Sequence, residues 1–413
     1  MTGAPRMIEQ PALQTGRPLR LLTFTTLYPN AEQPHHGVFV ENRLRHLLAG
    51  GAVESRVIAP VPWFPLSSPR FGSYAINARV PRIEERYGIA IEHPRYGLPP
   101  KIGMLPAPLL LYWGARRAVH RLRRSGYDFD VIDAHYFYPD GVAAALLARE
   151  FGKPLVITAR GTDINLIPQY AIPRWMIQWA AGQASAMITV CAALKTTLTE
   201  LDVPDERITV LRNGVDLQTF HPIDPAQARE ALGESPEGIL LVSVGHLIER
   251  KGHHHVIGAL PRLPGARLLV AGTGPEKTAL EALAGRLGVA DRVRFLGQVP
   301  HGRLAQLYSA ADALVLASSR EGWANVLLEA MACGTPVVAS NIWGTPEVVT
   351  VPEAGRLMPE LSPNGVACAV SDLLRAPPER KATRFYAEQF SWNDTTTGQI
   401  SIFADICCDG LNP

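Results

Sequence analysis

Two glutamates, Glu321 and Glu329, stand eight residues apart where an apolar segment is followed by a helix-forming one. Residues 313–317 have the length and apolar character of a buried strand. Gly322 breaks this segment, and residues 325–332 are rich in good helix formers. Ligands bind at the carboxyl ends of parallel strands, and the free N–H groups of a helix N-terminus bind phosphate. The spacing therefore predicts a site in which two acids contact the two ends of a phosphorylated ligand, as in a nucleotide-sugar site.

The string around these acids carries a resemblance. Gly follows Glu321, Glu329 opens the run Glu-Ala-Met-Ala-Cys-Gly-Thr-Pro-Val-Val, and Trp-Gly-Thr-Pro-Glu ends at Glu347. This string resembles the retaining glycosyltransferase family 4, and bacterial surface-polysaccharide enzymes of the teichuronic-acid, capsule and exopolysaccharide type. The resemblance implies an α/β GT-B fold, with two Rossmann-like, doubly wound parallel-sheet domains facing across a cleft. It also implies transfer of a sugar from a nucleotide-diphosphate sugar to a saccharide or polyprenyl-diphosphate-linked acceptor, with retention of configuration.

In the second half of the chain, the resemblance implies roles for both acids. Glu329 would accept hydrogen bonds from the ribose hydroxyls, and Glu321 would contact hydroxyls of the transferred sugar. Arg250 and Lys251 follow a predicted strand and would neutralise the leaving diphosphate. An isolated Arg-Lys pair would suit a solvated turn equally well. His246 stands where many members of the family have Arg, which leaves phosphate affinity and donor choice open.

Other donor contacts are implied for backbone groups and small residues near the predicted strand ends. Trp323 would either lie against the sugar ring or pack in the core. The implied set comprises Gly245, Val299, Gly322, Trp323, Ala324, Asn325 and Val326.

In the first half, His135 ends a predicted strand, and the family often has His-x-His at this place. His135 matches the second of these histidines, whereas Asp133 replaces the first. Two interpretations of His135 stay open, a catalytic helper and a packing residue. Arg160 and Asp163 lie in a loop resembling the family's G-x-D segment. Gly37 would let the backbone approach the sugar phosphate.

We expect no cofactor and no required metal. Asp128-Phe-Asp130 resembles a metal motif of another transferase fold, but it precedes a strand and is interpreted as a loop. Consecutive side chains diverge on a helix, so residues 253–255, three histidines, cannot all face one metal. The glycines of 272–278 lack the order of a P-loop or a dinucleotide fingerprint. We assign no carboxylate nucleophile.

Repeated strand and helix patterns predict two parallel sheets. Predicted helices are 39–49, 141–150 and 325–332, and predicted strands are 19–27, 54–59, 130–135, 154–159, 186–190, 208–211, 238–244, 266–271, 292–296 and 313–317. The predicted domains are an acceptor-binding domain over 1–211, a donor-binding domain over 212–385, and a C-terminal helix and tail over 386–413 that return to the first domain.

Composition and charge narrow the class of protein. The 413 residues are 47% hydrophobic and 19% charged, which is typical of a globular chain. Residues 1–200 carry 22 Lys and Arg against 14 Asp and Glu, a net +8, whereas 201–413 carry 18 against 24, a net −6. The basic first half suggests an anionic partner. No nucleic-acid reader motif accompanies it, so we expect no nucleic acid. Five cysteines without metal-ligand spacing suit a reducing cytosol.

Residues 101–124 combine apolar and aromatic side chains with a run of arginines. Such a segment could lie on an anionic membrane, or form a core helix with a solvated cationic end. The first eighteen residues lack the apolar core of a signal peptide, and no apolar stretch is long enough to span a bilayer. We therefore expect a cytoplasmic protein that can associate peripherally with the inner face of the plasma membrane.

Two alternatives to a transferase stay open at this point. A nucleotide-sugar epimerase on the same fold would use the same donor site. A non-catalytic partner of a transferase could bind a nucleotide sugar without turnover. His246 and the replaced first histidine keep the second alternative open, whereas the acids and cations of the donor site argue against it.

Overall fold

The structure, a computed structural model, describes residues 17–98 and 103–409. The chain divides into two compact units. The first unit contains the described residues up to Val190, Lys195–Leu211, and the described residues from Asn393 on. The second unit contains Cys191–Leu194 and Arg212–Trp392.

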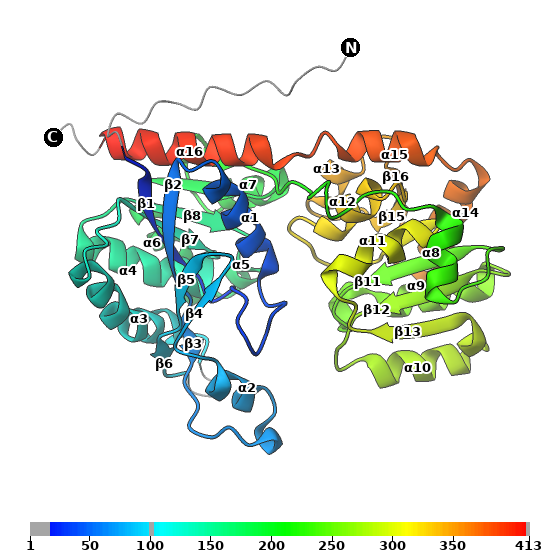
Figure 1. Ribbon diagram of the computed structural model, residues 1–413, viewed down its shortest axis with the longest axis horizontal. Helices are drawn as coiled ribbons and strands as arrows, with labels where there is room; N and C mark the ends of the chain where they lie inside the picture. The colour runs from blue at the N-terminus through cyan, green and yellow to red at the C-terminus, as the bar shows by residue number, and fades with distance from the viewer. Residues whose placement is uncertain (1–16, 99–102, 410–413) are drawn as a thin grey trace, which may run out of the picture. The chain divides into compact units, whose positions relative to one another are not determined.

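The first unit is built on an eight-stranded sheet with the order β10-β9-β8-β7-β1-β2-β5-β4 (Figure 1). Neighbouring strands are parallel except for β4, which is antiparallel to β5. β7 and β8 are buried along their whole length, as expected for a parallel sheet covered on both faces. The strands are β1 (Leu19–Phe24), β2 (Val53–Ile58), β4 (Ile83–Arg86), β5 (Ile89–Glu92), β7 (Val131–His135), β8 (Leu155–Ala159), β9 (Ala186–Thr189) and β10 (Ile208–Val210).

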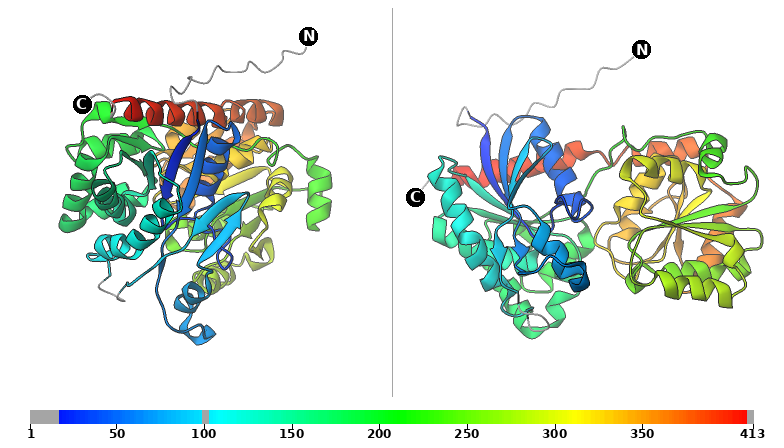
Figure 2. Two further views of the ribbon diagram at one scale, coloured as in Figure 1. Left: turned by 60° about the vertical axis from the view of Figure 1, so that its left-hand side comes forward. Right: turned by 60° about the horizontal axis from the view of Figure 1, so that its bottom comes forward.

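Helices cover both faces of this sheet. Leu44 of α1 and Phe403 of α16 share one apolar core with Leu21, Val131 and Val156. Figure 2 shows α16, in red, running alongside this unit. On the other face, α4 packs against α3 and α6. The helices are α1 (Val38–Ala49), α3 (Ala107–Arg124), α4 (Val142–Phe151), α5 (Thr162–Asn165), α6 (Ala171–Gln183), α7 (Ala192–Thr199) and α16 (Trp392–Asp409).

A small substructure protrudes from the first unit (Figure 1). Its two-stranded sheet pairs β3 (Val61–Pro62) with β6 (Arg95–Tyr96). A short helical turn, η1 (Pro69–Phe71), and helix α2 (Ser73–Arg79) complete it.

The second unit is built on a six-stranded sheet, all of whose neighbouring pairs are parallel. Its order is β13-β12-β11-β14-β15-β16, so successive strands are added first on one side of β11 and then on the other. The strand order therefore reverses between β11 and β14, the position where ligands of doubly wound sheets bind. The strands are β11 (Leu240–Val244), β12 (Arg267–Ala271), β13 (Val293–Gly297), β14 (Ala313–Leu316), β15 (Val337–Ser340) and β16 (Gly355–Met358).

One face of this second sheet is covered by α9, α10 and α14, whose apolar side chains share a core with the strands. Elsewhere in this unit α11 packs against α8 and α12, and α12 packs against α15. The helices are α8 (Pro225–Leu232), α9 (His253–Ala259), α10 (Lys277–Arg286), α11 (His301–Ala310), α12 (Asn325–Ala332), α13 (Thr345–Val348), α14 (Pro363–Arg375) and α15 (Arg380–Ala387).

The two Rossmann-like parallel sheets confirm the predicted α/β class, with several corrections to the elements. β1 ends at Phe24 rather than residue 27, because the amide of Thr26 donates to Asp140 instead of to a neighbouring strand. A π-helical turn, η2 (Phe137–Gly141), precedes α4. The last helix begins at Trp392 rather than residue 386, after the separate helix α15. Among the described residues, no helix combines the length and apolar character that crossing a bilayer requires.

Candidate functional site

In the second unit, the loops that follow β11 and β14 are held against each other by their backbones. Gly252 has a left-handed φ of +68°, and a Cβ there would lie 1.8 Å from the carbonyl oxygen of Ala317. The amide of Ser319 donates to the carbonyl oxygen of Arg250 at 2.9 Å. Because no side chain fits between the two loops, the residues that follow each strand are brought to one place.

This close approach brings the predicted residues Lys251 and Glu321 together. Lys251 Nζ lies 2.6 Å from Glu321 Oε1, and both side chains are largely buried. Arg250 Nη1 lies 3.9 Å from Glu321 Oε2 and donates to the carbonyl oxygen of Arg320 at 2.8 Å. The acid and the two cations therefore form one cluster at the point where the strand order reverses.

The cluster keeps Glu321 ionised. Burial alone would raise the pKa of this carboxyl, but the charge and hydrogen bond of Lys251, with the charge of Arg250, outweigh it and lower the pKa. A carboxylate that stays ionised can accept hydrogen bonds from hydroxyl groups. The paired cations can bind a diphosphate, provided that it replaces Glu321 as their partner.

Glycines also bring the loop after β12 against the loop after β11. A Cβ on Gly272 would lie 1.8 Å from the carbonyl oxygen of Gly245, and one on Gly274 would lie 2.3 Å from that of Leu247. The amide of Gly245 donates to the carbonyl oxygen of Ala271. Gly245 thus lies at the carboxyl end of β11, as predicted. Val299 follows β13, two strands away, and is half-buried.

Residues 322–326 lead into α12, which begins at Asn325 as predicted. The first N–H groups of a helix have no partner within it, so this turn can donate to an anion. Trp323 is 7% exposed, and its Nε1 donates to the carbonyl oxygen of Asn213 at 3.1 Å. Its ring lies 6.1 Å from that of Phe390. These contacts agree with the packing interpretation of Trp323.

Glu329 lies on α12 and has a partner that the sequence did not indicate. Tyr308 of α11 donates its hydroxyl to Glu329 Oε2 at 2.9 Å. Burial raises the pKa of Glu329 to about 7, although the hydrogen bond from Tyr308 acts in the opposite direction. The carboxyl therefore changes its charge close to neutral pH.

Of the three consecutive histidines at the start of α9, the first points into the core and the other two lie against each other. His253 is buried, and its Nδ1 lies 2.9 Å from Ser243 Oγ. The rings of His254 and His255 contact each other at 4.0 Å. Within residues 17–98 and 103–409, no three His, Cys, Asp or Glu side chains are grouped so that they could hold a metal ion.

In the first unit, His135 is held inside the protein by two charged residues. It is 1% exposed, with Nε2 3.1 Å from Asp133 Oδ2 and Nδ1 2.6 Å from Arg160 Nη2. Since Arg160 can only donate, Nδ1 accepts, and the ring proton is on Nε2, which faces the Asp133 carboxylate. Burial lowers the pKa of His135 to about 4. Both ring nitrogens are thus engaged and the ring is neutral, as a packing and positioning role requires.

Asp163 and Gly37 also have structural partners. Asp163 is fully buried and accepts from the amides of Phe137, Arg160 and Gly161, at 2.8, 3.1 and 2.7 Å. It therefore ties the end of β7 to the end of β8. Gly37 has a φ of +72°, and a Cβ there would lie 2.2 Å from the carbonyl oxygen of Leu27. Only glycine allows the loop before α1 to close in this way.

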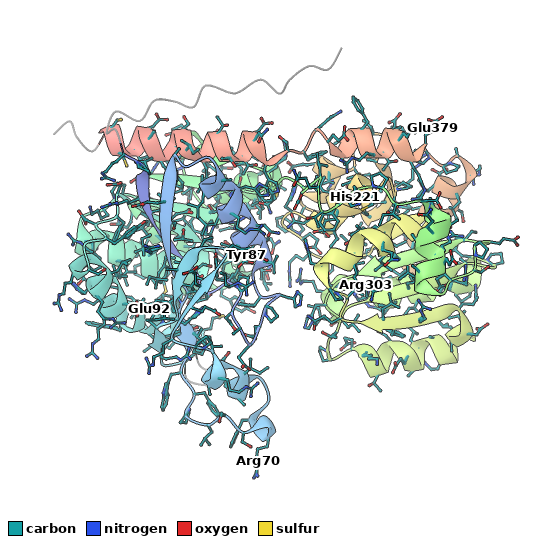
Figure 3. The ribbon with its side chains drawn as sticks, in the orientation of Figure 1. Arg70, Tyr87, Glu92, His221, Arg303 and Glu379 are labelled. Atoms are coloured by element: carbon teal, nitrogen blue, oxygen red, sulfur yellow. The ribbon has the colours of Figure 1, made fainter. Side chains whose placement is uncertain are left out.

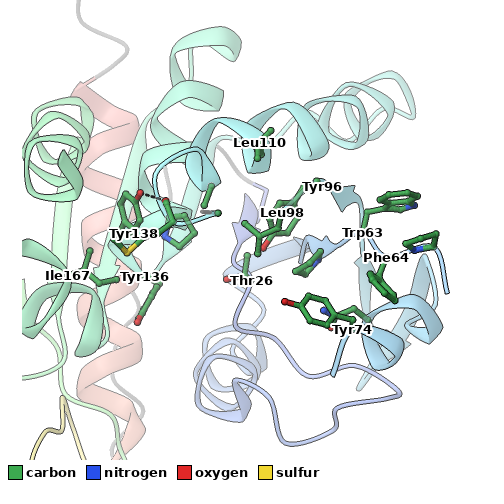
Figure 4. A pocket seen from close by; sticks show the side chains of 18 residues that line it. Thr26, Trp63, Phe64, Tyr74, Tyr96, Leu98, Leu110, Tyr136, Tyr138 and Ile167 are labelled. Carbon is green, nitrogen blue, oxygen red and sulfur yellow. Dashed lines mark hydrogen bonds between the residues drawn. The ribbon is translucent and has the colours of Figure 1, made fainter. Parts of the chain in front are cut away.

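The first unit also contains an apolar pocket that the sequence did not predict (Figure 4). Its volume is about 920 Å³. It extends from the ends of β1 and β7, at Thr26 and Tyr136, to the protruding substructure. Further lining residues are Pro62, Trp63, Phe64, Pro65, Tyr74, Asn77, Tyr96, Gly97, Leu98, Gly103, Met104, Ala107, Leu110, Tyr138, Pro139 and Ile167.

Helix α3 occupies most of the segment predicted to contact a membrane, while residues 101 and 102 lie outside the described part. Leu111 and Ala115 are buried, whereas Trp113 is 62% exposed. Arg116 pairs with Glu150, and Arg121 pairs with Glu92. One face of the helix thus belongs to the core, as the core-helix alternative proposed, and its other face is open to solvent.

Comparisons with known proteins agree with this fold. The family described as Glycosyl transferases group 1 matches residues 225–390, and Glycosyltransferase Family 4 matches residues 39–219. The D-inositol 3-phosphate glycosyltransferase of Mycobacteroides abscessus is 32% identical over 326 residues, covering 75% of this chain and 73% of that protein. The N-acetyl-alpha-D-glucosaminyl L-malate synthase of Bacillus anthracis is 28% identical over 296 residues, covering 69% and 77%.

Solved structures show the same fold. A sucrose-phosphate synthase from Thermosynechococcus elongatus matches with a TM-score of 0.79 at 22% identity, covering 95% of this chain and all of the other. HepE from Anabaena, solved in complex with UDP, matches with a TM-score of 0.68 at 21% identity, covering 93% and 98%. With the two family matches and a relative above 30% identity, the chain belongs to the family 4 glycosyltransferases of the GT-B fold.

Proposed function

We propose that this glycosyltransferase moves a sugar from a nucleotide-diphosphate sugar to a saccharide or lipid-linked saccharide in cell-surface polysaccharide biosynthesis, with retention of configuration. It would act in the cytoplasm, peripherally at the inner face of the plasma membrane. The main support for binding of the donor is the cluster of Lys251, Arg250 and Glu321 beside the start of α12. It combines cations for a diphosphate with an ionised acid for sugar hydroxyls.

In the proposed reaction, the bond between the sugar carbon and the diphosphate oxygen breaks through an oxocarbenium-like state. An acceptor hydroxyl oxygen bonds to that carbon, and its proton passes to the leaving diphosphate. Arg250, Lys251 and the first amides of α12 would stabilise the negative charge that develops on the leaving diphosphate. Glu321 would hold hydroxyls of the transferred sugar, and Glu329 those of the ribose. We propose that these groups suffice without a metal ion. Gly245, Val299 and residues 322–326 would complete the donor site.

In the first unit, Gly37, Arg160 and Asp163 would shape the loops on the acceptor side, and His135 would position Arg160. The relatives named above act, by their names, on D-inositol 3-phosphate and L-malate, which are small and anionic. This chain instead offers an apolar pocket at the ends of β1 and β7. The difference supports a larger acceptor with an apolar part.

The donor side is tested by calorimetry and thermal-shift measurements with UDP, GDP, ADP and their sugars. We expect saturable binding of one nucleotide, weakened in Glu329→Ala. Glu281→Ala, on an exposed helix face of the same unit, serves as the control. A folded protein that binds none of these ligands would refute the proposed donor site.

Two further measurements test the remaining parts of the proposal. Nuclear magnetic resonance of the product gives its anomeric configuration, and an inverted product would exclude retention. Flotation with anionic vesicles tests peripheral association, and a protein that stays in the soluble fraction would exclude it.

A further inference from the structure

The apolar pocket of the first unit begins where a transferred sugar would be accepted. Thr26 follows β1, and Tyr136 directly follows β7, at the two strand ends where the order of the eight-stranded sheet reverses. Thr26 is fixed there because its amide donates to Asp140 at 2.6 Å. In doubly wound sheets this position is the usual ligand site. One end of the pocket is therefore polar and belongs to the reactive edge of the sheet.

The rest of the pocket is apolar and aromatic. Among the described residues that line it, none carries a charged side chain. Trp63, Phe64 and Tyr74 from the protruding substructure face Leu110 and Leu98 across it (Figure 4). Its volume is at the upper end of the range for small-molecule sites. A polar saccharide alone would leave its hydroxyls unsatisfied against these walls.

Apolar side chains continue from the pocket onto the surface. Trp63 and Met104, which line it, are 58% and 44% exposed, and Leu66 and Leu105 beside them are 49% and 42% exposed. In the protruding substructure itself, Phe71 and Tyr74 are also exposed, at 37% and 44%. Exposed apolar side chains gathered in this way mark an interaction surface.

Positive charge accompanies this surface. Arg70 projects from the tip of the protruding substructure (Figure 3), and Arg117 is exposed on α3. Basic residues beside exposed apolar ones favour an anionic lipid surface. A water-soluble acceptor would need neither the exposed apolar residues nor the cations.

We propose that this pocket binds the apolar chain of a lipid-linked saccharide acceptor, with the saccharide at the ends of β1 and β7 and the chain running towards Trp63. This inference rests on the proposed function and specifies its acceptor. Tyr138 supports the pocket wall through a hydrogen bond from its hydroxyl to the carbonyl oxygen of Met104. The protruding substructure, which was not among the predicted sheets, would supply the pocket wall that the lipid chain contacts.

The test measures binding of farnesyl diphosphate and dodecyl phosphate to the full-length protein by calorimetry, with inorganic pyrophosphate as the chainless control. We expect saturable binding of at least one chain-bearing probe and none of pyrophosphate at the same concentration. Leu110→Gln places an amide in the pocket and should weaken that binding about tenfold or more. Leu109→Gln makes the same change on the same helix at a residue that does not line the pocket, and should bind as the unchanged protein does.

UDP binding, measured on the same samples, separates this proposal from the proposed function. If UDP binds and both chain-bearing probes fail, or bind Leu110→Gln equally well, the pocket is not a lipid site and the donor assignment stands. Chain binding without nucleotide binding would instead overturn the donor assignment. Trp63→Ser, at an exposed position, provides a second pocket variant if Leu110→Gln unfolds, and it should weaken binding in the same direction.

Discussion

The polar residues at the place where the strand order reverses have different partners in the two units. In the second unit, Lys251 and Glu321 bring opposite charges together between the ends of β11 and β14. In the first unit, Asp133 and Arg160 turn inwards and hold a neutral His135, and the space beyond the strand ends is lined by apolar side chains. The comparison shows that one topology places ion-paired side chains at the reversal of strand order in one unit and apolar side chains there in the other, because the loops decide the chemistry.

The largest expected effect tests the charged side of this comparison. Lys251→Met removes the cation nearest Glu321 and should lower kcat/KM by about 10²–10³, the cost typical of losing a group that stabilises transition-state charge. It also leaves Glu321 with a weaker partner, so the unfolding temperature should fall. The double variant Lys251→Met with Glu321→Gln should recover part of the lost unfolding temperature, but not the activity.

Lys277→Met provides the matched control, because Lys277 pairs with Glu281 on an exposed helix face. Exposed pairs of this kind contribute little to stability. We expect its activity and unfolding temperature to match those of the unchanged protein. Activity of Lys251→Met within tenfold of the unchanged protein would remove this residue from the proposed reaction.

The second prediction concerns the pH dependence of donor binding. Glu329 has a pKa of about 7, raised by burial, so it is increasingly protonated as the pH falls below 7. If its carboxylate holds the ribose, UDP affinity should fall with pH and approach a tenfold loss per unit well below 7. Glu329→Gln should bind UDP weakly and without this dependence, which calorimetry between pH 5.5 and 8.5 would show.

The same pKa shift predicts an effect on stability. The folded protein holds the Glu329 proton more tightly than the unfolded chain, so between the ordinary pKa of 4.5 and about 7 folding stability falls as the pH rises. Above pH 7 the buried carboxyl is ionised, and its full cost to folding stability is present. Glu329→Gln should therefore unfold a few degrees, roughly 2–4 °C per kcal/mol, above the unchanged protein at pH 8. Equal unfolding temperatures of the two proteins at pH 8 would contradict the raised pKa of Glu329.

The buried residues of the first unit can be tested in the same way. His135→Gln removes the acceptor of Arg160 and the ring that faces Asp133, and should destabilise the protein by about 1–3 kcal/mol, the cost of unsatisfied buried groups. We expect kcat to stay within tenfold, since both ring nitrogens are already engaged. His120→Gln, at a partly exposed position, serves as the control. A thousandfold loss of kcat with unchanged stability would show that His135 acts in catalysis.

The smallest expected effect refines the donor site. Tyr308→Phe removes the hydroxyl that donates to Glu329 and so removes a contribution that lowers the pKa of this carboxyl. The midpoint of the pH dependence of UDP binding should move upwards, while affinity above that midpoint changes little. Calorimetry across the same pH range as for Glu329→Gln measures the shift. A midpoint that moves downwards would mean that the hydroxyl does not support the carboxylate.

The sequence predicts the two sheets well, because their central strands are continuous apolar runs and their motifs lie next to the strand ends. Helix α12 has the predicted bounds, and Lys251 meets Glu321 as their places at neighbouring strand ends imply. The protruding substructure was not predicted, since β3 and β6 have two residues each and carry no periodic pattern. Tyr308 was missed as well, because its contact with Glu329 joins two helices and no local spacing signals it.

The contact between Gly252 and Ala317 has a consequence for engineering. Two loops from different parts of the chain fit together without space for one methyl group, so neither can be exchanged alone for the loop of another transferase. A chimaera that transplants only one of them would bring in a backbone shaped for a different neighbour. Exchanging this region for that of another transferase therefore requires replacing both loops together, or leaving both in place and altering only the side chains that they carry.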